Sequence, residues 1–494
     1  MPCSAARARE SKRRKTQILV GKRTPTIYDG RRARSDVFGS IKPRCNPKIA
    51  NYELLNYKCV HLLMTYKERA FWWDTVIMPE GEAAALPENV DVAVIGSGFS
   101  GLSAARTLAR RGAQVAVLEA ESLCWGASSR NGGMVLTGMK LGVGKLVSRY
   151  GLEATRRMYA ASLASINCVE QVVREERIAC DFARTGHLEV ACKPAHFAAF
   201  RRSAEVIARE FNHHLRLVPR SELRSEIGSS IYHGGLVDEA SAGLNPARYV
   251  AGLGRAAQKA GARLFDQARV TSVEPASRKG SGGFQLTTAR GRLWARDVFI
   301  GTSGYTGAAT PGLHKRIIPI GSYIIATEPL PEALARELSP QSRMIFDSKN
   351  YLYYYRLTAD NRMLFGGRAA FFPETGNTIR RSAEILRRGM VGVYPQLRQA
   401  KVEYAWGGTL DFAFDIMPHA GKMDGMYYAV GYAGHGVAMA TYLGSKVAEA
   451  MCGAEDQNPF ADIAFPGAPL GLYNGKPWFL PFAGAWYKFL DIVR

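Results

Sequence analysis

The chain has 494 residues, of which 47% are hydrophobic and 22% are charged, so a largely disordered protein is excluded and a large core is allowed. The formal net charge is +22, and residues 1–63 contribute half of it, with 15 Lys and Arg against 4 Asp and Glu. The eight cysteines include no C-x-x-C pair, which argues against a metal site or a disulfide scaffold. Without a secretory signal, free thiols indicate a reducing compartment, and we expect a cytoplasmic protein.

The basic segment 1–63 has three interpretations: a nucleic-acid-binding tail, an Arg-rich transit peptide, or non-native sequence translated from an upstream start codon. We favour the third, because Met64 opens a short aromatic segment that leads directly to the first predicted strand. In each case we expect this segment to be disordered.

A glycine motif follows that strand. The apolar strand 91–95 runs into Gly96-Ser-Gly98-Phe99-Ser100-Gly101 and a helix over 99–112, and Glu119 ends the next strand, 115–119. The glycines allow a tight turn, a close approach of phosphate to the backbone and close packing of helix on sheet. The helix N-terminus favours phosphate, and Glu119 can accept hydrogen bonds from a ribose diol. The pattern predicts dinucleotide binding.

A second glycine-rich segment, Trp125-Gly126-Ala127-Ser128-Ser129-Arg130-Asn131-Gly132-Gly133, comes shortly after Glu119. Its glycines let backbone approach a planar ring system, and Ser128, Ser129 and Arg130 can bind phosphate. In this position the segment indicates a second clamp on the cofactor.

The middle of the chain alternates helices and strands. Helical spacing covers 152–175, 195–210 and 246–260, while 317–328 and 351–368 alternate as in an antiparallel sheet. Within this sheet Tyr353 and Tyr355 share one face, and Tyr354 and Arg356 share the other, so only one pair can face the cofactor. An aromatic wall of the site and a cross-strand core stack both explain these tyrosines.

A third glycine turn lies near the C-terminus. A strand over 426–431 leads to Gly434-His435-Gly436 and a helix to Cys452, whose N-terminus can face an electron-rich atom. His435 is either a polar contact near cofactor or substrate, or a turn histidine held by backbone. The uncharged run 427–445 indicates a buried strand and helix rather than a membrane span. The aromatic tail 473–494 contains Pro481, which we expect to kink it, and should pack on the body.

The predicted fold class is α/β, with a Rossmann-type dinucleotide-binding domain interleaved with an antiparallel-sheet substrate domain. The expected segments are 86–150, 240–310 and 400–455 for the first domain, 151–239 and 311–399 for the second, and 456–494 for the tail.

Together these motifs resemble FAD-dependent amine oxidases of the D-amino-acid oxidase and glycine oxidase superfamily, and most of all its gamma-glutamylputrescine oxidoreductase branch. The similarity covers about Phe71 to Asp491 and rests on G-S-G-F-S-G (96–101), W-G-A-S-S-R-N-G-G (125–133), G-L-N-P-A-R-Y (243–249), P-I-G-S-Y-I-I-A-T-E-P-L (319–330), L-F-G-G-R (364–368), W-G-G-T-L-D (406–411) and G-Y-A-G-H-G-V-A-M-A-T (431–441).

The resemblance implies that FAD oxidises an amine to an imine, which hydrolyses to an aldehyde, and that oxygen is reduced to hydrogen peroxide. It implies catalytic roles for His435, Tyr353, Tyr355 and Arg368, where Arg368 either binds an acidic substrate end or closes the sheet edge. The implied cofactor contacts are Gly96, Gly98, Phe99, Ser100, Gly101, Glu119, Ala120, Gly126 through Gly133, Val270, Thr302, Gly304, Trp406, Gly408, and Gly434 through Ala438.

Two differences from related sequences narrow the expected substrate and the expected mode of FAD binding. Sarcosine-oxidase-like relatives carry a Lys soon after G-H-G, whereas this chain has Val437-Ala-Met-Ala, which favours a longer amine over a small amino acid. Residues 345–368 contain no Cys, and Gly126 follows Trp125, so we expect FAD to be bound non-covalently.

Two other functions stay open: a quinone-linked amino-acid dehydrogenase with the same fold, and an RNA-modifying flavoprotein that uses the basic N-terminus. The 125–133 segment and the C-terminal turn argue against NAD in place of FAD. The expected partners are an amine and molecular oxygen, with no metal, no transmembrane segment and no expected role for nucleic acid.

Overall fold

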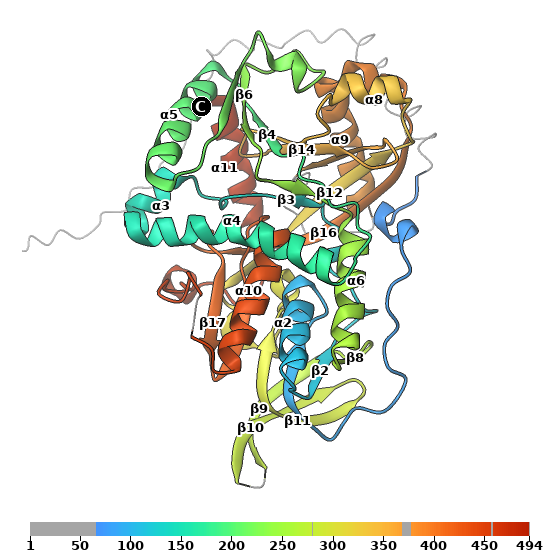
Figure 1. Ribbon diagram of the computed structural model, residues 1–494, viewed down its shortest axis with the longest axis vertical. Coiled ribbons are helices and arrows are strands. Elements are labelled where there is room, and N and C mark those ends of the chain that lie inside the picture. The colour runs from blue at the N-terminus through green and yellow to red at the C-terminus, as the bar shows by residue number, and fades with distance from the viewer. Residues whose placement is uncertain (1–65, 279, 368–376, 456–457, 494) are drawn as a thin grey trace, which may run out of the picture. The chain divides into compact units, whose positions relative to one another are not determined.

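The computed structural model describes residues 66–278, 280–367, 377–455 and 458–493 (Figure 1). The predicted disorder of residues 1–63, and with it the possible RNA-binding tail, lies outside the described residues. Among the helices of the described chain, none combines the length and the apolar character needed to cross a bilayer.

The first sheet has the strand order β17-β18-β11-β1-β2-β8, with the hairpin β9–β10 attached through β11. Its centre is parallel, since β1 pairs in parallel with both β11 and β2, while β17 joins β18 antiparallel. The strands are β1 Asn89–Ile95, β2 Val115–Leu118, β8 Arg263–Phe265, β9 Val270–Arg278, β10 Ser281–Thr288, β11 Gly291–Ile300, β17 His419–Met423 and β18 Met426–Val430.

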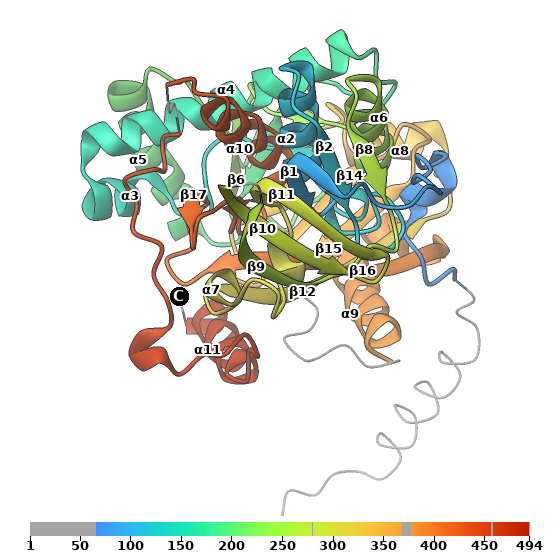
Figure 2. The same cartoon turned by 90° about the horizontal axis from the view of Figure 1, so that it is seen from below.

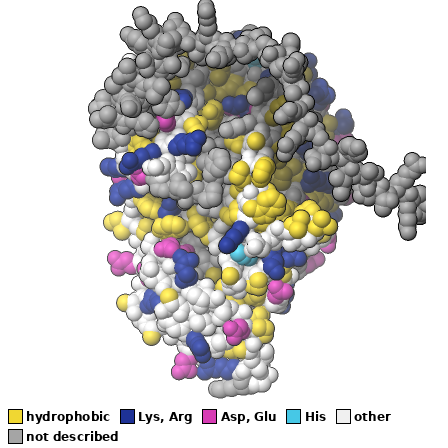
Figure 3. Space-filling model, turned by 180° about the vertical axis from the view of Figure 1, so that it is seen from behind, with side chains coloured by type: hydrophobic (Ala, Val, Ile, Leu, Met, Phe, Trp, Pro, Cys, Tyr) yellow, Lys and Arg dark blue, Asp and Glu magenta, His cyan; other side chains and the backbone are white. Residues whose placement is uncertain are grey.

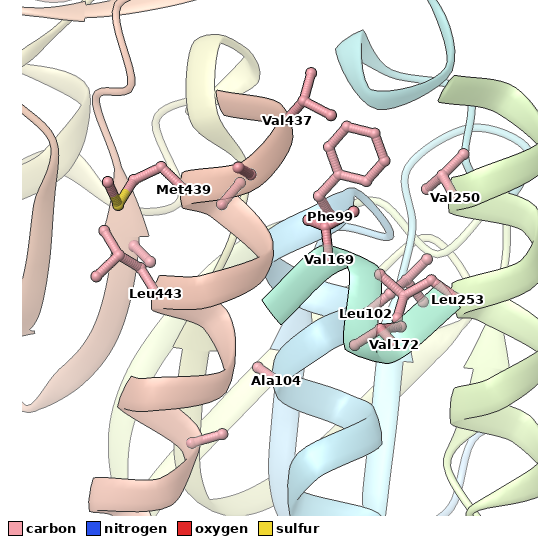
Figure 4. Close-up of a cluster of buried hydrophobic side chains, with 14 of the residues drawn as sticks. Phe99, Leu102, Ala104, Val169, Val172, Val250, Leu253, Val437, Met439 and Leu443 are labelled. Carbon is pink, nitrogen blue, oxygen red and sulfur yellow. The ribbon is translucent and has the colours of Figure 1, made fainter. Parts of the chain in front are cut away.

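Three helices cover one face of this sheet: α2 (Phe99–Arg110), α6 (Pro246–Lys259) and α10 (Gly436–Met451), while β9 and β10 cover the other (Figure 2). The helices meet in a core where Phe99 lies between Val437 of α10 and Val250 of α6 (Figure 4). This packing brings the N-termini of α2 and α10, which are 337 residues apart, to the same edge of the sheet.

The second sheet has the strand order β16-β12-β15-β14-β13-β4-β6-β5 and is antiparallel except where β13 meets β4. Helix α9 (Thr378–Val393) packs on one of its faces. The strands are β4 His187–Val190, β5 Arg216–Pro219, β6 Gly234–Asp238, β12 Ile317–Thr327, β13 Met344–Asp347, β14 Tyr353–Leu357, β15 Met363–Gly367 and β16 Val402–Ala413.

The remaining elements connect these layers. They are the short pair β3 (Met134–Val135) and β7 (Ala242–Gly243), the helices α3 (Val143–Tyr150), α4 (Leu152–Glu175), α5 (Pro194–Phe211), α7 (Pro311–His314), α8 (Glu332–Leu338) and α11 (Leu480–Val493), and the 3-10 turns η1 (Phe71–Thr75), η2 (Ala127–Ser129), η3 (Leu223–Ser225), η4 (Ser303–Tyr305), η5 (Pro395–Gln399) and η6 (Pro469–Gly471).

Two features differ from the sequence-based expectation. Strand β16 pairs with β12 along its length and so belongs to the second sheet, although the predicted dinucleotide-binding segment began at 400. The C-terminal tail forms helix α11, and Pro481 lies in its first turn, where a missing backbone N–H costs nothing, so it does not kink the segment. The α/β fold class itself is confirmed: one sheet with a parallel centre is interleaved with a largely antiparallel one.

Candidate active site

The first glycine turn closes the end of β1 against α2. Gly96 has φ +100°, a conformation that side chains disfavour, and a Cβ at Gly101 would overlap the carbonyl oxygen of Gly96. A Cβ at Gly98 would lie 2.9 Å from Oγ of Ser128. Ser128 also accepts a hydrogen bond from the Phe99 amide at 2.9 Å. The turn therefore leaves a bare backbone cradle at the N-terminus of α2, as a pyrophosphate requires.

The acid after β2 lies against this turn. The Glu119 carboxylate accepts hydrogen bonds from the backbone amide and the hydroxyl of Ser97, at 2.9 and 2.6 Å. The same side chain also accepts from the amide of Glu121 at 3.1 Å. These bonds fix the carboxylate at the end of the strand, where it can receive a ribose diol.

Three indole groups hold the second clamp. The Nε1–H of Trp73 donates to Ser129 Oγ at 3.0 Å. The Nε1–H of Trp406 donates to the Arg130 carbonyl at 2.8 Å, and that of Trp72 donates to the Asn131 carbonyl at 2.9 Å. Trp72 and Trp73 lie in η1, whereas Trp406 lies in β16. Three consecutive clamp residues are thus fixed by segments that precede and follow them by more than 50 residues. We name this arrangement the indole clasp.

The clamp residues divide into cofactor-facing and structural ones. Ser128 faces the first glycine turn, and its binding of phosphate stays a prediction. Ser129 is fully buried and donates its hydroxyl to Cys124 O at 2.6 Å. The Arg130 guanidinium lies over the rings of Trp125 and Trp73, at 4.1 and 4.5 Å from the ring centroids. The prediction that Ser129 and Arg130 bind phosphate is therefore wrong: both stabilise the clamp.

These turns enclose a cavity of about 540 Å³. Fifteen of the predicted cofactor contacts line it: Gly96, Gly98, Phe99, Ser100, Glu119, Ala120, Gly126, Ala127, Ser128, Asn131, Val270, Thr302, Gly434, Gly436 and Val437. The others are not part of this lining, although Gly304 lies directly against it: a Cβ there would press on Thr409, which lines the cavity. Ser97, Asp411 and Tyr432 also line the cavity. They lie inside the quoted motifs, but sequence reasoning assigned the cofactor contacts there to other motif positions and missed these three.

The C-terminal turn is tied to the second sheet by a buried acid. Asp411 of β16 accepts the Gly431 amide at 2.6 Å, and burial raises the pKa of this carboxyl. Tyr432 donates to or accepts from the hydroxyl of Ser100, at 2.7 Å, and so joins the turn to α2. These bonds aim the N-terminus of α10 into the cavity, where it can stabilise negative charge.

His435 lies at the start of that helix and is neutral at physiological pH. Burial, then the positive charge of Lys140, lowers the pKa of its imidazole to about 3, while a hydrogen bond to the backbone of Ala433 acts in the opposite direction. Its Nδ1 is buried and has no hydrogen-bond partner in the described chain. The ring is therefore held by backbone, and its Nδ1 is open; a contact of His435 with cofactor or substrate stays a prediction.

The tyrosines of β14 divide as the alternation required. Tyr355 is buried behind the second sheet, donates its hydroxyl to Tyr232 at 2.8 Å and stacks on Phe365. Tyr353 contacts the same core under α9. On the other face, a Cβ at Gly132 would lie 3.1 Å from the Tyr354 ring. The prediction of catalytic Tyr353 and Tyr355 is therefore corrected, because strand register turns Tyr354 towards the clamp. Arg368 lies outside the described residues.

Strand register extends the face of Tyr354 into a row across the second sheet. Consecutive partners in this row are Glu189, Phe346, Tyr354, Gly366, Ile324 and Trp406. We name it the clamp-facing row, because Tyr354 and Trp406 both contact the 129–132 segment. Glu189 is the one carboxyl side chain of this row.

Glu189 is a second residue that sequence reasoning missed. Burial raises the pKa of its carboxyl to about 7, and the charge of Lys140 acts in the opposite direction. The same lysine lowers the pKa of His435, so the acidic end of the clamp-facing row and the C-terminal turn share one electrostatic environment. Only the period-2 alternation of β4 could have indicated that Glu189 points to the site side, and a strand of four residues makes that signal weak.

A cradle of glycine backbone, two helix N-termini and a fixed carboxylate fit a dinucleotide that carries a planar ring system. Residues 91–450 match the family described as FAD dependent oxidoreductase. The chain is 32% identical over 404 residues to the gamma-glutamylputrescine oxidoreductase of Escherichia coli, with 81% of this chain and 92% of that protein covered. A probable oxidoreductase, OrdL, of Haemophilus influenzae is 32% identical over 423 residues, with 82% and 93% covered.

Among solved structures, glycine oxidase from Geobacillus kaustophilus is similar in fold, with a TM-score of 0.65 at 20% identity, covering 77% of this chain and all of that one. The extent of the family match, together with the cradle, identifies the cofactor as FAD. The chain belongs to the FAD dependent oxidoreductase family, whose related members act on amines or amino acids.

Proposed function

We propose that the protein oxidises a long amine of the gamma-glutamylputrescine type to an imine, which hydrolyses to an aldehyde, and that the electrons pass to oxygen to give hydrogen peroxide. The similarity to the Escherichia coli enzyme supports this substrate class. The observation that carries the proposal is Glu189, the one carboxyl side chain of the clamp-facing row. A carboxylate at that place favours an ammonium group over the carboxylate of a small amino acid.

Bound FAD supplies a two-electron acceptor for the carbon next to the substrate nitrogen. The protein must orient that carbon and keep the reacting nitrogen neutral, since an ammonium cannot assist the loss of a hydride. Lys140 contributes to the second task, because a nearby positive charge disfavours a protonated amine. The neutral His435, with its open Nδ1, can accept a hydrogen bond from the substrate N–H.

In this proposal Glu189 binds an ammonium group of the substrate, and Tyr354 together with Phe346 forms the apolar wall along its chain. A partly buried carboxylate such as Glu189 gains from pairing with a cation because part of its hydration has already been lost. A diamine derivative presents one nitrogen for oxidation and leaves a second polar group to be recognised, which suits a row that is apolar except at one end. We also propose that the protein works in the cytoplasm, in keeping with the five free thiols of the described residues.

The test is an anaerobic absorption spectrum of the purified flavoprotein. Single amines are added in turn: gamma-glutamylputrescine, putrescine, sarcosine and D-alanine. Bleaching of the flavin bands by the first, and return of the bands with stoichiometric hydrogen peroxide when oxygen is admitted, is the expected result. Bleaching by D-alanine or sarcosine alone overturns the substrate class. If the bands return only with a soluble quinone, oxygen is not the electron acceptor, and the protein is a quinone-linked dehydrogenase.

A further inference from the structure

The described chain exposes large apolar side chains mainly in one place. Of ten such side chains, six lie between residues 470 and 489, and the other four are Ile77, Tyr305, Ile231 and Ile385 on separate elements. We name the six the aromatic face: Leu470, Leu472, Trp478, Phe482, Trp486 and Phe489. Figure 3 shows apolar side chains gathered on the corresponding side of the protein, with Lys and Arg side chains beside them.

Helix α11 presents this face because it is apolar on both sides. Leu480 and Gly484 are buried towards the body. Phe482, Trp486 and Phe489 are spaced i, i+4 and i+7, so they share the outer side of the helix, and their exposed fractions are 72%, 59% and 51%. A helix that is apolar all round is normally buried, so its outer side lacks a partner in the described chain.

The position of α11 is fixed at both ends. Near its C-terminus, the Asp491 carboxylate accepts hydrogen bonds from the amides of Asn350 and Tyr351, at 2.8 and 2.9 Å. Lys193 Nζ donates to the Asp491 carbonyl at 3.0 Å. Before the helix, Tyr473 donates its hydroxyl to Ile317 O at 2.7 Å. The outward display of the aromatic face is therefore a property of the folded protein and not of a frayed end.

Exposed lysine lies beside this face. Within the described part of segment 466–494, Lys476 is exposed, whereas the acid Asp491 is engaged with Asn350 and Tyr351. Gly475 lies directly against His314, so Lys476 and Lys315 come to the same edge, and both are exposed. Exposed Trp and Phe beside lysines match the boundary between lipid headgroups and acyl chains of an anionic bilayer.

We propose that the aromatic face docks the protein peripherally on an anionic lipid surface, with Phe482, Trp486 and Phe489 entering the boundary region. Charge complementarity favours this occupant over a second copy of the chain, because a symmetric self-contact would bring the lysines of both copies together. The helix lies in the plane of the surface and does not span it, as expected for an aromatic, positively charged face of this length.

The test is co-sedimentation of the full-length holoprotein with phosphatidylcholine vesicles, with and without roughly one third phosphatidylserine. The variant is Phe482→Ser/Trp486→Ser, whose positions are exposed and so leave the core intact. The matched control is Ile77→Ser/Ile231→Ser, which removes two exposed apolar side chains elsewhere. We expect binding to the anionic vesicles that falls about tenfold or more in the variant and is unchanged in the control.

Three results overturn the proposal. Equal binding by wild type and variant shows that another part of the chain, such as the 15 Lys and Arg of residues 1–63, carries the attachment. No binding by the wild type excludes a lipid surface. A dimer in sedimentation velocity without vesicles, which Phe482→Ser/Trp486→Ser dissociates, assigns the face to a second copy. Bound flavin and thermal unfolding of each variant establish that it is folded.

Discussion

The cofactor cavity and the clamp-facing row differ in what builds them. The cavity is built around backbone, with glycine turns at Gly96–Gly101 and Gly431–Gly436 and two helix N-termini, and polar side chains such as Glu119 and Ser128 are set into these turns. The row is shaped by side chains that reach the site only because six strands pair in one register.

This difference decides how each region responds to change. At Gly96 and Gly101, replacement of the glycine brings a Cβ against a backbone carbonyl, so both FAD binding and the sheet are affected. A side chain that is replaced in the row leaves the sheet pairing intact and, under the proposed function, alters one contact with substrate. Substitutions in the cavity should therefore impair FAD binding and folding, whereas substitutions in the row should change catalytic activity.

Gly101→Ala is expected to have the largest effect. The new Cβ would overlap the Gly96 carbonyl oxygen and push α2 away from β1. We expect bound flavin per protein to fall by about tenfold or more, together with several degrees in Tm. The control is Gly142→Ala, where a Cβ has nothing within 4 Å and φ is ordinary. Retention of flavin by Gly101→Ala would contradict the close approach of α2 to β1.

Glu189→Gln should separate substrate binding from stability. The carboxylate is lost, so we expect KM for a long amine to rise about tenfold to a hundredfold with a smaller change in kcat. In the folded protein the pKa is about 7 against an ordinary 4.5, so the folded state holds this proton more tightly and stability falls as pH rises through that window.

The glutamine variant lacks this loss, and it should therefore be more stable than wild type at pH 8, by about 3 kcal/mol at most, and equal to it below pH 4.5. Urea unfolding at several pH values measures the difference. If the variant is more stable but its KM is unchanged, Glu189 is shielded from solvent as described but does not bind the substrate.

Tyr354→Ala and Tyr355→Phe test the register of the row. Tyr354 faces the clamp, so its loss should lower kcat/KM by about tenfold, and it should also lower Tm because the ring packs against Trp72 and Trp406. Tyr355 faces the α9 core, so Tyr355→Phe should cost about 1 kcal/mol of stability through the lost bond to Tyr232 and leave KM unchanged. Steady-state kinetics and urea unfolding of both variants give the answer. An exchange of the two phenotypes would mean that β14 presents its other face.

Trp73→Phe should have the smallest effect. It removes the Nε1–H bond to Ser129 in the indole clasp and keeps most of the ring packing. We expect a loss of about 1 kcal/mol in unfolding free energy and a twofold to fivefold weaker FAD affinity, where a fivefold change is about 1 kcal/mol. Trp294→Phe is the matched control, because the buried Nε1–H of Trp294 has no hydrogen-bond partner in the described chain. Equal losses in both variants would show that ring volume, and not the hydrogen bond, holds the clamp.

The sequence could predict features that depend on local spacing. The helix expected over 152–175 is α4, and the strand, turn and helix around Gly96–Gly101 are present as expected, since glycine spacing and apolar periodicity are local signals. The face of β14 could not be predicted, because alternation fixes only that Tyr353 and Tyr355 lie together, and α9 decides which side is core. Likewise, the sequence around Arg130 predicts a phosphate ligand, because the contact of its guanidinium with the ring of Trp73, which is distant in the sequence, exists only in the folded chain.

The indole clasp has an optical consequence. Three of the seven tryptophans donate to residues 129–131, directly beside the cavity lined by Ala127 and Ser128. Indole emission overlaps flavin absorption, so energy transfer over this short distance should quench the fluorescence of these tryptophans when FAD is bound. Tryptophan fluorescence should therefore report how much FAD is bound, without substrate, electron acceptor or label.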